Sequence, residues 1–228
     1  MLVASLLTHG SRQSRITGQA YVRATYHKEY VNYLFCINTK QWRVKNFTLI
    51  LEHAMKNNEA SGCIKRQLLL CLYMLKDCID RCPDNEWNEC HKDYPFSRVV
   101  FHTLIDCDLN LSDNEKELKD QEIHKKYRYE FGEYEELEGR ISERTYSRDF
   151  IEKYYMHCIG KVVSVFIAKI DNVLLSPNSD YYGSMTKMER YINCIRHTQH
   201  HAAQLGLRLQ FITGKEMNWI GRRDEMQS

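Results

Sequence analysis

The chain has 228 residues, which suits one domain of ordinary size with a terminal extension. Hydrophobic residues make up 43% of it, and only 3 Pro and 10 Gly are present, so a helical core is favoured over a turn-rich β fold. The net charge is only +2, and no basic stripe with interleaved aromatic residues is present. These features argue against a nucleic-acid partner.

The apolar segments and cysteines bear on the compartment. The opening MLVASLL lacks a positively charged start and is too short for a signal peptide, and no apolar run approaches the roughly 20 residues that span a bilayer. The 9 cysteines are odd in number and form no C-x-x-C pair. Cys71, Cys78 and Cys82 are spaced as one helical stripe, which favours reduced core thiols over disulfides or a zinc knuckle. We therefore expect a soluble, cytoplasmic protein with no membrane partner.

Residues 1–58 differ from the rest of the chain. Residues 1–60 hold 8 Lys and Arg against 3 Asp and Glu, and most of the segment has no clean helical or strand period. Only WRVKNFTLILEHAMKN fits a short amphipathic helix. We predict a partly disordered N-terminal extension over 1–58 and a folded domain over 59–222. A start codon placed too far upstream would give the same pattern and remains an alternative.

Two helices are predicted in the first half of this domain. The segment CIKRQLLLCLYMLKDCIDRC repeats apolar residues at spacings of three and four, and Pro83 ends it. A second helix runs from about Pro95, at the favoured first position, through FSRVVFHTLIDCDLNL. Ser112 and the residues after it end this helix.

Two more helices follow a long connection. Residues 113–146 are charged and irregular, and a connection of this length lets the third helix enter from the same end as the second. The third helix opens at Ser147 as its N-cap and closes before Pro177. The fourth starts near Ser184 and ends at Gly214. Four helices of this length predict an all-α fold, a four-helix bundle.

The main chemical signal is the H-x-x-x-H pair His197 and His201 on the fourth helix. Four residues advance a helix by about one turn, so both imidazoles leave the same face and can bind one ion at roughly 2.0–2.1 Å. A lone pair of this kind is more often two histidines on a partly polar surface. His200 adjoins the pair but points about 100° away, toward another face.

A third histidine, His102, lies in the middle of the second helix among apolar neighbours. A buried imidazole needs a partner for each nitrogen, or a metal in place of one. The alternative is a core histidine bonded to a neighbouring carbonyl or to Asp106, one turn further on. His157 is interpreted as a separate core or surface histidine. The remaining histidines, in the extension and loops, show no pattern: His27, His53, His91 and His124.

Together these segments resemble the DinB/YfiT-like superfamily of metal-dependent enzymes. The resemblance rests on YPFSRVVFHTLIDCDLNLS followed by IRHTQHHAAQLGLRLQ, with CIDRCPDNEWNE, SRDFIEKYYMHCIGKV and NWIGRR in support, and it covers about 60–222. In that family a histidine on the second helix joins an H-x-x-x-H-x-x-Q pattern on the fourth, matched here by His197, His201 and Gln204. The resemblance implies a four-helix bundle with up-down-down-up connections, one divalent metal ion and a homodimer.

The resemblance also implies a chemistry. Three imidazoles leave a coordination position open, as in catalytic zinc sites, and zinc, nickel or iron would each accept them. Characterised relatives include thiol transferases that use bacillithiol or mycothiol. The expectation is thus a metal-dependent enzyme, a thiol-dependent S-transferase acting on small molecules in detoxification, with His102, His197 and His201 as metal ligands. Gln204 would orient a ligand, and Asp106 would either orient one, accept a proton or simply be solvated.

The catalytic residues are not predicted by any motif. Cys158 and Cys194 lie on helices beside the expected site, but buried, inert thiols are the favoured interpretation of both. Two alternatives to an enzyme stay open: a non-catalytic metal-binding bundle with a structural or stress-related role, and a bundle whose histidines are merely packed. Metal content and metal-dependent melting distinguish these two.

Overall fold

The computed structural model describes residues 60–90, 94–132, 144–167, 174 and 185–221. These residues belong to the second of two units into which the chain divides, Ala54–Ser228. The extension predicted over residues 1–58 lies outside them. The described residues are mostly helical and contain no strand, which confirms the prediction of an all-α fold for this part of the chain. None of its helices is both long enough and apolar enough to cross a membrane.

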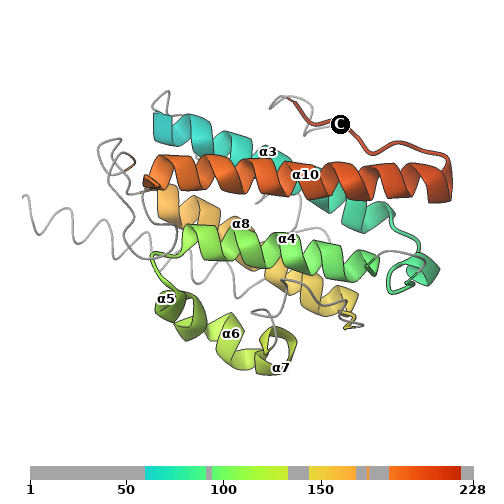
Figure 1. Ribbon diagram of the computed structural model, residues 1–228, viewed down its shortest axis with the longest axis horizontal. Coiled ribbons are helices and arrows are strands. Elements are labelled where there is room, and N and C mark those ends of the chain that lie inside the picture. The colour runs from blue at the N-terminus through green and yellow to red at the C-terminus, as the bar shows by residue number, and fades with distance from the viewer. Residues whose placement is uncertain (1–59, 91–93, 133–143, 168–173, 175–184, 222–228) are drawn as a thin grey trace, which may run out of the picture. The chain divides into compact units, whose positions relative to one another are not determined.

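Four long helices form the framework: α3 (Ala60–Arg81), α4 (Phe96–Leu111), α8 (Arg148–Ile167) and α10 (Lys187–Thr213). Helix α10 packs against α3 and α4, and α8 packs against the same two helices (Figure 1). Each helix therefore has two long neighbours, and the apolar core lies between them.

The helix directions follow from Figure 1 and from the contacts. Helices α3 and α10 run in one direction, and α4 and α8 run in the opposite one (Figure 1). The start of α4 meets the end of α10, where Arg208 donates a hydrogen bond of 2.7 Å to the Tyr94 carbonyl. The end of α4 meets the start of α10, where Arg190 donates to the Leu109 carbonyl. Helices α4 and α10 are therefore an antiparallel pair joined by hydrogen bonds near both ends.

The core is built from the apolar stripes of these helices. Fully enclosed side chains include Leu68, Leu72 and Leu75 of α3, Phe101 and Leu104 of α4, Ile151 and Tyr154 of α8, and Cys194 and Ala202 of α10. The predicted stripe Cys71, Cys78 and Cys82 is buried, and all three are free thiols. The interpretation of these cysteines as core thiols is confirmed.

The predicted helix ends that fall within the described residues agree with the structure apart from one small shift, and the predicted end of the third helix, before Pro177, lies outside those residues. The Ser147 hydroxyl accepts a hydrogen bond from the Phe150 amide at 3.2 Å, and Gly214 closes α10 with a left-handed φ of 71°. The fourth helix, predicted to start near Ser184, begins slightly later, because Thr186 is its N-cap. The side chain of Thr186 accepts from the Glu189 amide and the Glu189 carboxylate accepts from the Thr186 amide, which is a capping box.

The connection after α4 also needs correction. Residues 113–146 were predicted to be irregular, but three short helices lie within the described part: α5 (Glu115–Asp120), α6 (Glu122–Lys126) and α7 (Arg128–Phe131). Leu118 and Phe131 are their buried apolar anchors. The α5 helix opens at Asn114, whose side chain accepts from the Glu117 amide.

The buried carboxylate of Asp108 links this connection to the long helices by hydrogen bonds. Asp108 of α4 is fully buried and accepts hydrogen bonds from the Tyr154 hydroxyl at 3.0 Å and from Lys161 at 2.5 Å, while His124 Nε2 of α6 lies 2.8 Å from it. Burial alone would raise the pKa of Asp108, but the hydrogen bonds of His124 and His157 and the charge of Lys161 outweigh it and hold this pKa well below its usual range. Asp108 is therefore a carboxylate at neutral pH.

Candidate metal centre

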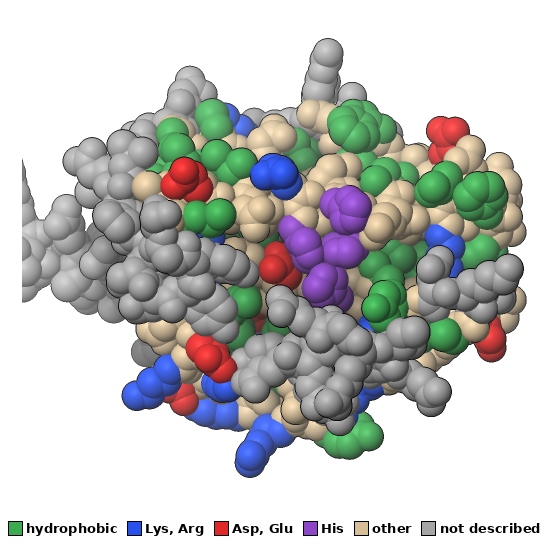
Figure 2. Space-filling model, in the orientation of Figure 1, with side chains coloured by type: hydrophobic (Ala, Val, Ile, Leu, Met, Phe, Trp, Pro, Cys, Tyr) green, Lys and Arg blue, Asp and Glu red, His purple; other side chains and the backbone are tan. Residues whose placement is uncertain are grey.

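The three predicted histidines come together halfway along the α4–α10 pair. His197 and His201 lie one turn apart on α10, and His102 faces them from α4. Thr198 and Ala202, on the same turns of α10, are buried and face the core. The two imidazoles therefore lie where α10 meets α4. Histidine side chains gather at one place on the face drawn in Figure 2.

The ring nitrogens of the triad converge. The Nε2 atom of His197 lies 3.1 Å from the Nε2 of His102 and 3.1 Å from the Nε2 of His201. One potential ligand atom from each of the three lies within 4.8 Å of the other two. The rings meet edge to face, with centroids 4.5–4.9 Å apart. All three imidazoles thus point one nitrogen at a common position.

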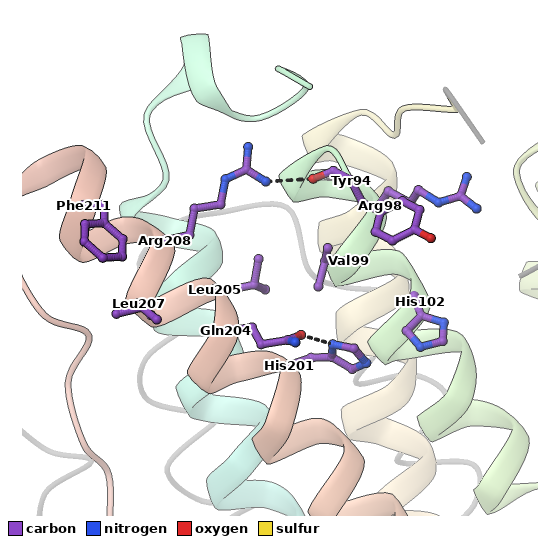
Figure 3. Close-up of a pocket in the computed structure, with 10 residues that line it drawn as sticks. All are labelled: Tyr94, Arg98, Val99, His102, His201, Gln204, Leu205, Leu207, Arg208 and Phe211. Carbon is purple, nitrogen blue, oxygen red and sulfur yellow. Dashed lines mark hydrogen bonds between the residues drawn. The ribbon is translucent and has the colours of Figure 1, made fainter. Parts of the chain in front are cut away.

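Gln204 fixes the orientation of His201. The Nδ1–H of His201 donates to the Gln204 Oε1 at 2.8 Å (Figure 3). With its proton on Nδ1, the imidazole keeps an unprotonated Nε2 that faces the other two histidines. Gln204 therefore lies where the sequence suggested, one turn beyond the pair.

Asp106 pairs with His197 of α10 and not with His102, which precedes it by one turn of α4. Its Oδ2 lies 3.0 Å from His197 Nδ1, across the interface between α4 and α10, at ion-pair distance but not aligned as a hydrogen bond. Asn110 donates to the same Oδ2 at 3.0 Å and so holds the carboxylate in place. The sequence offered Asp106 as one possible partner of His102, beside a backbone carbonyl, and did not indicate its place beside His197.

Burial keeps two of the imidazoles neutral. Burial first, and then the charges of His197 and His201, lower the pKa of His102 to about 4. Burial, followed by the charge of His197, also lowers the pKa of His201. Because a neutral imidazole has one unprotonated nitrogen, both histidines can act as ligands at pH 7.

The donor set fits a divalent ion better than a hydrogen-bonded cluster. A ring nitrogen has either one N–H or one lone pair, so His197 Nε2 cannot form good hydrogen bonds with both neighbours at once. A tetrahedral ion bound at roughly 2.0–2.1 Å would hold its nitrogen ligands about 3.3 Å apart, close to the two distances of 3.1 Å. In the described part of the chain, the buried Nδ1 of His102 has no hydrogen-bond partner. Its Nε2, which lies 3.1 Å from His197 Nε2, is the nitrogen that faces the other two histidines.

A cavity of about 560 Å³ adjoins the triad between α4 and α10 (Figure 3). His102, His201 and Gln204 line one end of it. Val99, Leu205, Leu207 and Phe211 give it an apolar wall, and Tyr94, Arg98 and Arg208 line the other end. The volume suits a small organic molecule.

The other residues considered from the sequence are not part of the converging triad. His200 is exposed, as its helical phase predicted, and its ring lies edge to face against that of His201, with centroids 5.1 Å apart. His157 lies on α8, where its Nε2 is 2.6 Å from Gln121 Oε1. Cys158 and Cys194 are fully buried in the core. Burial raises the pKa of Cys158, and the hydrogen bond with Cys107, followed by burial, raises the pKa of Cys194, which disfavours the reactive thiolate in both.

Sequence reasoning missed two arginines at the cavity and one histidine elsewhere. Arg98 precedes His102 by four residues and Arg208 follows His201 by seven, so helical phase alone could have found them. His124, which showed no pattern, is buried against Asp108. No local signal links these last two residues, because they come from different elements.

No protein-family model, curated protein or solved structure matches this chain.

Proposed function

We propose that this chain is a metal-dependent enzyme of the DinB type, in which His102, His197 and His201 bind one divalent ion, either zinc, nickel or iron. The observation that carries the proposal is the convergence of three Nε2 atoms beside a small-molecule cavity. The helix directions agree with an up-down-down-up four-helix bundle, and Gln204 occupies the place that the family pattern gives it. The apolar cavity at the open side of the triad favours an enzyme over a purely structural metal site.

The proposed reaction is S-transfer from a low-molecular-weight thiol to an electrophilic small molecule, as in detoxification. A bound divalent ion would supply a position at which a thiol loses its proton. The sulfur then forms a bond to the electrophilic carbon, the leaving group departs with its electron pair, and the proton passes to solvent. The chain itself contributes orientation: Gln204 is hydrogen-bonded to His201, Asp106 lies at ion-pair distance from His197, and the apolar wall offers a surface for the electrophile.

We further propose that the protein is cytoplasmic. All eight cysteines in the described part of the chain are free thiols. They form no disulfide even though buried cysteines come from five different helices or connections. Reduced cysteines in this number are typical of a reducing compartment.

The activity test uses full-length protein loaded with zinc, nickel or iron. Glutathione, bacillithiol and mycothiol are each offered with chlorodinitrobenzene, and thioether formation is followed by absorbance. We expect one thiol to react at a rate that the His197→Ala/His201→Ala variant loses and the His200→Ala variant keeps. His200 is the matched control because it is exposed and adjacent in sequence and is not one of the three converging ligands, although its ring contacts that of His201. Equal rates in all three proteins would refute the proposed enzyme.

A further inference from the structure

Gln204 has a second polar group that its contact with His201 does not use. The Oε1 atom of its amide accepts a hydrogen bond from His201 Nδ1 at 2.8 Å (Figure 3). The Nε2 atom at the other end of the amide carries two N–H donors. This Nε2 makes no hydrogen bond to any residue that the structure describes. Gln204 therefore retains two donors that a bound molecule can use.

The histidine contact fixes which end of the amide faces which way. The Nε2 of His201 lies 3.1 Å from the Nε2 of His197 and faces the triad, so the proton of the neutral imidazole belongs on Nδ1. An N–H at Nδ1 needs an acceptor, and the oxygen is the acceptor of the Gln204 amide. The amide nitrogen is therefore the end that does not contact His201. The contact that orients the imidazole also fixes the two donors of Gln204.

These donors belong to a residue that lines the cavity. Gln204 is exposed and lies at the same end of the cavity as His102 and His201. The described lining of the cavity holds no Asp or Glu. A carboxylate in the lining would accept the N–H groups of Gln204 and would repel negative charge on a ligand. The surroundings of Gln204 therefore suit a ligand that brings its own acceptor oxygen.

A hydrogen-bond donor at this place favours one type of electrophile. When sulfur attacks a carbon that is conjugated to a nitro or carbonyl group, the C–S bond forms while a π-electron pair moves onto the oxygen. That pair then returns and expels the leaving group, and the thiol proton passes to solvent. A hydrogen bond to the oxygen is stronger while the oxygen carries the charge, so it lowers the barrier. A saturated alkyl halide forms no such oxyanion and gains nothing from the donor.

We propose that Gln204 binds the acceptor oxygen of the electrophile through Nε2, and that the electrophiles of this protein are conjugated nitro or carbonyl compounds with a leaving group. This inference rests on the proposed S-transfer and defines its electrophile class. Gln204 has two roles in this account, one toward His201 and one toward the substrate. Loss of one hydrogen bond to a charged oxygen corresponds to a decrease in rate of about ten- to hundredfold.

The first test compares two electrophiles in the full chain loaded with zinc. Chlorodinitrobenzene has nitro groups conjugated to its reacting carbon, benzyl chloride has none, and both lose chloride to a thiol, here glutathione, bacillithiol or mycothiol. The ratio of kcat/KM for the two electrophiles is measured within each protein, so differences in metal content cancel. Gln204→Glu keeps an acceptor for His201 and removes both donors, so we expect the ratio to fall about ten- to hundredfold. Gln199→Glu should leave it unchanged, because Gln199 is a half-buried residue of α10 that does not line the cavity.

The second test needs neither metal nor turnover. Two thioethers of mercaptoethanol, one with a dinitrophenyl group and one with a phenyl group, are titrated into the chelator-treated full chain by calorimetry. We expect the dinitrophenyl thioether to bind about two- to tenfold more tightly, as one neutral hydrogen bond allows. Both Gln204→Glu and Gln204→Met should lose this preference, and Gln199→Glu should keep it. The methionine side chain has no charge, so loss of the preference in Gln204→Met excludes repulsion as the cause.

The outcomes separate the two proposals. Absence of turnover with every thiol overturns the S-transfer and the electrophile class with it, whereas the binding preference still tests the donor role of Gln204. Turnover whose ratio is the same in Gln204→Glu as in the wild type overturns the role of Gln204 alone. A binding preference that Gln204→Met retains also overturns this role, because the amide donors would then not be the recognition groups.

Discussion

Removing the charge of Asp106 should weaken metal binding without unfolding the protein. Its Oδ2 lies 3.0 Å from His197 Nδ1, and Asn110 holds it there. A carboxylate behind a ligating histidine fixes the ring and raises its basicity, and loss of such a group typically costs about 10–100-fold in affinity. The Asp106→Asn substitution keeps the size of the side chain, so we expect a loss within this range, or about 1.4–2.7 kcal/mol.

The assay is competition for zinc against a chromophoric chelator. Asp113→Asn is the control, because Asp113 follows α4, is 64% exposed and pairs with Lys187 away from the triad. An exposed pair of this kind contributes at most about 1 kcal/mol to stability and does not contact the centre. Thermal melting of the metal-free proteins checks that Asp106→Asn folds. Zinc affinity equal to that of the wild type in a folded Asp106→Asn protein would refute the role given to this carboxylate.

Three further predictions concern stability. Asp108→Asn should lower the free energy of unfolding by about 3–5 kcal/mol in urea denaturation, because the substitution leaves the buried partners of the carboxylate uncompensated. The control Asp80→Asn, at an exposed ion pair, should change the free energy of unfolding by less than about 1 kcal/mol. A similar small effect at both sites would contradict the buried network. The metal-free protein should lose about 2–3 kcal/mol as the pH falls from about 6.5 to 4, because the unfolded state then protonates His102 while the folded state, with a pKa of about 4, does not. Urea titrations in chelator should show that His102→Asn flattens this slope, and an unchanged slope would refute the assignment. Gly206→Ala should stabilise α10 by about 1 kcal/mol in a Met217→Ala background but not in the wild type, where the added Cβ would lie 2.5 Å from the Met217 sulfur. Equal effects in both backgrounds would show that this contact is unimportant.

The four long helices were predictable because their apolar residues repeat at helical spacing and because Pro83, Ser147 and Gly214 limit them. The start of α10 was predicted slightly too early, and its position could have been refined, since Thr186 and Glu189 form the T-x-x-E pattern of a capping box. The short helices α5, α6 and α7 were missed because they have few buried apolar side chains and no sustained period.

The candidate site was predictable to a lesser extent. The spacing of His197 and His201 places them on one face, but only the antiparallel crossing of α4 and α10 brings His102 to them. The same crossing brings Asp106 of α4 next to His197 of α10. Because the two residues belong to different helices, their separation in the sequence does not indicate this contact. The cavity itself depends on side-chain packing between two helices, which no periodicity describes.

The most direct test of the metal centre is the metal content of tag-free protein, measured by elemental mass spectrometry. Wild-type protein, the His197→Ala/His201→Ala variant and the His200→Ala control are purified in parallel and also offered zinc, nickel and iron. We predict close to one divalent ion per chain in the wild type and in the control, and its loss in the double variant. Wild-type protein that contains no metal and takes up none of the three ions would contradict the account.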